Sequence, residues 1–160
     1  MRKYLLVALI FVVCTASATI PNNYYSAVNG KSGSAILPAL YGIISSHTDV
    51  GYDGLYSVYP QTDSKPGTNQ VWDIYSTCTF THGQKKCGSY STVCDCYNRE
   101  HTTPQSWFDS SGDPKNDVFN VYPTDGKVNG QRSNYPYGEC ANGTRLTSKA
   151  LGKLGTSTFS

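Results

Sequence analysis

The chain has few charged residues and no apolar run long enough to cross a membrane. Charged side chains make up 15% of its 160 residues, and the formal net charge is +2. The one long apolar run, residues 4–13, is shorter than the roughly 20 residues that a membrane-spanning helix needs. These absences exclude a strongly basic nucleic-acid-binding tail and predict no stable association with a membrane.

The N-terminus has the features of a signal peptide. Arg2 and Lys3 precede the apolar run, and Ala16 and Ala18 place small residues where a signal peptidase reads. We therefore expect a signal peptide over residues 1–18, a mature domain over residues 19–160, and export to the periplasm or the medium. Because Arg2 and Lys3 account for the whole positive excess, the mature chain is electrically balanced.

The cysteines fit an oxidising compartment. Of the six, Cys14 leaves with the signal peptide, and the mature chain keeps Cys78, Cys87, Cys94, Cys96 and Cys140. We expect a local disulfide between Cys78 and Cys87 and a second one from Cys94 or Cys96 to Cys140, with one cysteine left over. A zinc site of Cys94, Cys96 and His82 is the alternative, but a one-residue gap is shorter than that of typical zinc ligands.

Periodicity predicts a mixed α+β domain. Apolar spacing indicates helices over residues 34–46, 52–59 and 114–122 and a strand over residues 71–75. Residues 97–101 are interpreted as a strand that leads into the break at Pro104. The third helix is indicated by Asp113 and Pro114, which suit an N-cap and a first helical position. Trp72, Trp107 and most of the 13 tyrosines are assigned to the core. Stacking on unpaired bases is the alternative use of the tyrosines.

Three side chains are candidates for a hydrolytic site. Glu100 and His101 are neighbours just before a proline break, and Asn120 lies in a second, mostly apolar segment. Glu100 and Asn120 can hold an oxygen-ligated cation while His101 takes a proton from water. Neighbouring residues of a regular strand point to opposite faces, so this requires the chain to bend after His101.

Two segments, residues 98–108 and 117–138, resemble the signature of the bacterial endonuclease I family. The two occur in order and a short loop apart, which makes them far more specific together than either is alone. The resemblance implies a His-Me finger (ββα-metal) fold and an exported nonspecific nuclease. It further implies a monomer that cleaves DNA, with RNA as a second substrate.

The resemblance also implies individual roles. His101 matches the general base, while Glu100 and Asn120 match the ligands of Mg²⁺ or of another divalent cation such as Ca²⁺ or Mn²⁺. Arg132 matches a phosphate contact, and Asn134 lies in the same segment.

Relatives continue beyond a stretch like residues 154–159, so we expect the C-terminal part of the domain to be missing from this chain. Two alternatives remain open. One is a catalytically inactive nucleic-acid-binding remnant, and the other is a secreted structural protein held by disulfides.

Overall fold

A computed structural model describes residues 20–158, so the predicted signal peptide lies outside the described residues. The chain divides into two compact units, residues 1–47 and 48–160. In the first unit, 3₁₀ turns at Ser26–Val28 and Gly33–Ala35 precede helix α1 (Ile36–Ile44). The helix predicted over residues 34–46 is therefore confirmed. Pro38 is its third residue, in the first turn, where no intrahelical N–H bond is lost.

The second unit begins with helix α2 (Gly51–Thr62), which contributes to the core. Leu55 and Tyr59 are fully buried against Val121, and the Tyr59 hydroxyl donates to the Val121 carbonyl at 3.3 Å. A helix was predicted here with its end at Pro60, but the helix continues to Thr62 with Pro60 in its last turn.

Residues 63–96 form a loop region rather than the strand predicted over residues 71–75. Asp73 explains this difference, because its Oδ1 accepts hydrogen bonds from the backbone N–H groups of Tyr75 and Ser76. Such a side-chain turn competes with extended backbone. Trp72 and Trp107 were predicted as core residues, but their exposed fractions are 55% and 59%. Both predictions were wrong. The core here consists of Val71, Cys78, Phe80 and Tyr97.

Two disulfides hold this loop region, and both predicted pairings were wrong. The bonds join Cys78 to Cys94 and Cys87 to Cys96, and Cys140 is the free cysteine of the described residues. Backbone pairing explains the second bond. Tyr97 donates to the Lys85 carbonyl and accepts from the Cys87 N–H, which brings Cys87 beside Cys96.

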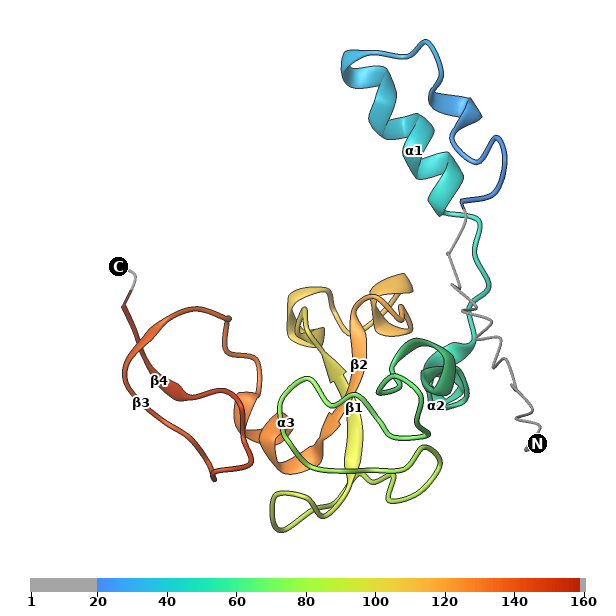
Figure 1. Cartoon of the computed structure of the whole chain (residues 1–160). Coiled ribbons are helices and arrows are strands. Elements are labelled where there is room, and N and C mark those ends of the chain that lie inside the picture. Colours follow the sequence, from blue (N-terminus) through green and yellow to red (C-terminus); the bar gives the residue numbers. More distant parts are fainter. Residues whose placement is uncertain (1–19, 159–160) are drawn as a thin grey trace, which may run out of the picture. The chain divides into compact units, whose positions relative to one another are not determined.

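The centre of this unit consists of two strands followed by a helix (Figure 1). Strand β1 (Tyr97–His101) pairs antiparallel with β2 (Val121–Asp125), with His101 opposite Val121 and Tyr97 opposite Asp125. Helix α3 (Gly126–Arg132) follows directly and packs on both strands. The strand predicted over residues 97–101 is confirmed.

The helix predicted over residues 114–122 was wrong. Only a 3₁₀ turn, Asp113–Lys115, forms there, and residues 116–120 make turns that lead into β2. Pairing with β1, which is distant in sequence, decides the conformation of residues 121–125. A second antiparallel sheet joins β3 (Cys140–Thr144) to β4 (Leu154–Ser157), so the α+β class is confirmed. No helix in the described part of the chain combines the length and the apolar character needed to cross a bilayer.

Candidate active site

Glu100 and His101 end strand β1, and both are buried, with 2% and 6% exposure. Their side chains have different partners, as expected for neighbours in a strand. Glu100 contacts Tyr75, Tyr137 and Arg132, whereas the His101 ring stacks on Tyr52 at 5.6 Å.

One cavity nevertheless includes both residues. It has a volume of about 360 Å³ and is lined by residues of β1, of α3 and of the loop after β1. Its polar lining includes Glu100, His101, Gln105, Asn129, Arg132 and Asn134. Four predicted site residues, Glu100, His101, Arg132 and Asn134, are thus brought together, and Asn120 is not among the lining residues.

Asn120 is occupied by internal hydrogen bonds. Its Oδ1 accepts from the Thr103 N–H at 2.8 Å and from the Thr102 hydroxyl at 3.0 Å, while its Nδ2 donates to the Pro114 carbonyl at 2.8 Å. The side chain therefore joins the start and the end of the loop between β1 and β2. It also fixes the backbone directly after His101.

Asn129 lines the cavity, whereas Asn120, the predicted metal ligand, does not. Asn129 lies on α3, and its Nδ2 donates to Asn98 Oδ1 at 2.8 Å and to the Arg99 carbonyl at 3.3 Å. These bonds orient the amide through its nitrogen, and its carbonyl oxygen accepts no hydrogen bond from the described residues. The sequence held a signal for this residue. Asp125 is an N-cap, and the helix that it starts places Asn129 and Arg132 three residues apart, on one face.

Arg132 joins the two sides of the site. Its Nη1 lies 2.9 Å from Glu100 Oε1, and the guanidinium also donates to the carbonyls of His101 at 2.9 Å and Thr102 at 2.7 Å. Burial raises the pKa of Glu100, while hydrogen bonds from Tyr75 and Tyr137 and the charge of Arg132 oppose that rise. The cavity is therefore arranged around one buried carboxylate.

The hydrogen bonds of His101 define its tautomer. Nε2 lies 3.0 Å from the Lys115 carbonyl, which can only accept, so Nε2 carries the proton. Nδ1 then accepts from the Gln105 amide at 3.2 Å and is the basic nitrogen. Burial lowers the pKa of His101, as do the charges of Arg99 and Lys115, and the bond to the Lys115 carbonyl acts in the opposite direction. The ring is therefore neutral at pH 7 and can accept a proton.

Known proteins resemble this chain over most of its length. The family model described as Endonuclease I matches residues 32–160. The chain belongs to the endonuclease I family.

Two curated relatives of this chain are named "Extracellular ribonuclease". The one from Bacillus amyloliquefaciens is 33% identical over 128 residues, which cover 78% of this chain and 42% of the relative. The one from Bacillus subtilis (strain 168) is 31% identical over 119 residues, covering 72% and 40%. The chain thus spans about two fifths of the length of these relatives. No solved structure matches it.

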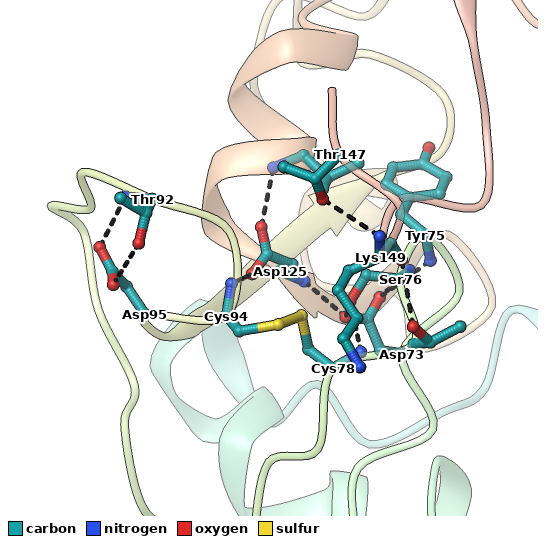
Figure 2. The surroundings of a disulfide bond; sticks show 12 residues. Asp73, Tyr75, Ser76, Cys78, Thr92, Cys94, Asp95, Asp125, Thr147 and Lys149 are labelled. Carbon is teal, nitrogen blue, oxygen red and sulfur yellow. Dashed lines mark hydrogen bonds between the residues drawn. A yellow bond between two sulfur atoms is a disulfide. The ribbon is translucent and has the colours of Figure 1, made fainter. Parts of the chain in front are cut away.

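A second group of possible metal ligands in this endonuclease I chain has a structural role. Donor atoms of Cys78, Cys94 and Asp125 lie within 4.8 Å of one another, but the two sulfurs are joined as a disulfide (Figure 2). The Asp125 carboxylate accepts from the N–H groups of Val128 at 2.9 Å and Cys94 at 2.6 Å. The alternative zinc site fails for the same reason, because Cys94 and Cys96 are both in disulfides. His82, its third member, is buried and bonded to Ser64.

Proposed function

We propose that this chain is a metal-dependent nuclease that hydrolyses phosphodiester bonds in the cavity at the end of β1. The observation that carries the proposal is the set of groups lining one cavity: a carboxylate (Glu100), a neutral imidazole (His101), a carboxamide (Asn129) and a guanidinium (Arg132). The order β1, β2, α3, with the histidine at the end of β1, supports the His-Me finger assignment that the sequence resemblance implied.

Glu100 and Asn129 are suitable ligands for a divalent cation. The contacts of Glu100 with Tyr75, Tyr137 and Arg132 within the described residues all end on Oε1, so Oε2 is the oxygen that can face the cavity. Asn129 is anchored through its nitrogen. A carboxylate oxygen and an amide oxygen are ligands that Mg²⁺, Mn²⁺ and Ca²⁺ accept. Such a cation would stabilise the negative charge that develops on the phosphate. We assign the second ligand to Asn129 rather than Asn120, whose amide is already satisfied.

His101 acts as the general base. Its Nδ1 takes a proton from a water molecule, the water oxygen attacks phosphorus, and one phosphorus–oxygen ester bond breaks. The bonding electrons leave with the ester oxygen, and the resulting alkoxide takes a proton from solvent. The Lys115 carbonyl holds the other nitrogen in its protonated form and stabilises the imidazolium that results. Deprotonating the water in this way provides a nucleophile close to neutral pH.

Arg132 contacts the phosphate. Its guanidinium lines the cavity beside Glu100 and His101, where its positive charge can attract a phosphate oxygen. Contacts to phosphate carry no base information, so cleavage with little sequence preference follows. The names of the two relatives support RNA as a substrate and export from the cell, and the family supports nucleic acids in general, DNA included.

The proposal is tested by incubating RNA and plasmid DNA with the full chain and Mg²⁺, with EDTA, and with two histidine variants. We expect EDTA and His101→Ala to abolish cleavage. His47→Ala is the matched control, because His47 is exposed and its one hydrogen bond among residues 20–158 is to the nearby Ser45 carbonyl, so this variant should cleave normally. If His101→Ala cleaves at the rate of the unmodified chain, the mechanism is contradicted. Nucleic-acid binding without cleavage by the unmodified chain would favour the inactive remnant.

A further inference from the structure

A second cavity lies next to the site and contains no group that the proposed chemistry uses except Arg132. It has a volume of about 280 Å³ and lies between α3, the loop after it and the segment that joins β3 to β4. Its wall is largely aromatic and aliphatic, with Tyr135, Tyr137, Val128, Leu146, Ala150 and Leu154 among the lining residues. Tyr135 and Tyr137 are more than half exposed, at 54% and 58%, which is unusual for rings that only fill a core.

The two cavities are connected through shared side chains. Arg132 lines both, and its guanidinium carbon lies 4.6 Å from the centre of the Tyr137 ring. Tyr75 and Tyr137 line the second cavity, while their hydroxyls bond to Glu100. A nucleic acid whose phosphate binds Arg132 in the cavity of Glu100 and His101 therefore has a neighbouring aromatic pocket that Arg132 also lines.

We infer that this second cavity binds the unpaired base of the nucleotide next to the cleaved phosphate, so that single-stranded nucleic acid is the preferred substrate. The inference rests on the proposed nuclease function and names its substrate class. Tyrosine rings and a guanidinium plane are the surfaces on which bases stack, and stacking tolerates any base. A base within a duplex is held by its partner and its neighbours, and it must first be unstacked before it can enter a pocket.

The rim of the cavity fits the same ligand. Lys153 and Gln131 lie among its lining residues and offer hydrogen-bond donors to the polar edge of a base. An aliphatic ligand would have no use for these donors.

The test compares kcat/KM for a single-stranded RNA and for a duplex of the same sequence. Tyr135 is the residue to change, because it lines the cavity and is not one of the partners of Glu100 in the described part of the chain. We expect the unmodified chain to prefer the single strand, and Tyr135→Ala to lower that preference at least about fivefold by slowing the single strand only. Tyr135→Phe keeps the ring and should retain the preference. Tyr41→Ala, which removes an exposed tyrosine of the other unit, should also retain it.

A second measurement uses small inhibitors. A nucleoside 5′-monophosphate should inhibit the unmodified chain at a lower concentration than ribose 5-phosphate, and Tyr135→Ala should remove this difference. Equal inhibition of the unmodified chain by the two compounds would overturn the base site, as would equal slowing of both RNA forms by Tyr135→Ala. Those results would leave nuclease activity intact. If the unmodified chain cleaves neither RNA form nor plasmid DNA, the proposed function and the base site are overturned together.

Discussion

Replacing Asp125 tests how α3 is held in place. The Asp125 side chain is fully buried and caps α3 through Val128, and it also accepts from the Cys94 N–H next to the disulfide (Figure 2). Asp125→Ala removes the cap, at a cost of about 1 kcal/mol. It also leaves the Cys94 N–H without its partner, at a cost of about 1–3 kcal/mol. The free energy of unfolding should therefore fall by about 2–4 kcal/mol.

This loss is measurable by urea unfolding under non-reducing conditions. For a domain of this size the midpoint should fall by about 1–2 M. Because α3 carries Asn129 and Arg132, cleavage by the folded variant should fall as well. Asp125→Asn keeps an oxygen for one N–H donor and turns an N–H₂ group toward the other. We therefore expect its free energy of unfolding to lie between those of the unmodified chain and of Asp125→Ala.

Asp95→Asn is the matched control. Asp95 is exposed, and its hydrogen bonds with described residues stay within its own turn, to Ser91 and Thr92. It should change neither cleavage nor the position of α3. An unfolding midpoint of Asp125→Ala equal to that of the unmodified chain would refute the capping role.

Three further predictions concern the loop, the base and the metal ligand. Asn120→Ala should reduce the free energy of unfolding by about 2–4 kcal/mol, measured by urea unfolding, because three hydrogen bonds lose their partner. Since the pKa of His101 is lowered by burial, kcat/KM should be full above about pH 6.5 and fall tenfold per pH unit below the His101 pKa. A kcat/KM that rises toward acid pH would contradict the role of His101 as the general base. Tyr75→Phe removes a hydrogen bond to Glu100 and should raise the metal concentration for half-maximal activity by about 10-fold or more. The rate at saturating metal should hardly change, and an unchanged metal requirement would argue against this role of Tyr75.

Local patterns predicted what local interactions decide. The helix at α1 follows apolar spacing, and the proline break after His101 ends strand β1 as expected. The pair Glu100 and His101 could be recognised as a candidate site because residues 98–108 resemble the endonuclease I signature.

Long-range pairing explains the mispredicted helix and disulfides, whereas a local side-chain turn at Asp73 explains the mispredicted strand. Asp113 and Pro114 have the local features of a helix start, yet Val121 pairs with His101 and draws residues 121–125 into a sheet. The disulfides depend on the same kind of contact, since Cys87 meets Cys96 only because the chain pairs with Tyr97. Neither contact is visible in the spacing of residues.

Because the helix forms at α3 and not over residues 114–122, the second metal ligand is assigned to a different asparagine. Once the chain enters β2 at Val121, Asn120 lies in the loop and its amide is used internally, while Asn129 comes to the cavity on α3. Two asparagines nine positions apart in one segment offer the same chemistry, and only the fold distinguishes them.

Cleavage of RNA as a function of Mn²⁺ concentration, measured for Asn129→Ala and for Asn120→Ala, tests the site most directly. We expect Asn129→Ala to need at least about 10–100 times more Mn²⁺ for half-maximal rate. Asn120→Ala should keep the metal requirement of the unmodified chain wherever it is folded. An unchanged requirement in Asn129→Ala, together with a raised one in folded Asn120→Ala, would contradict the site described above.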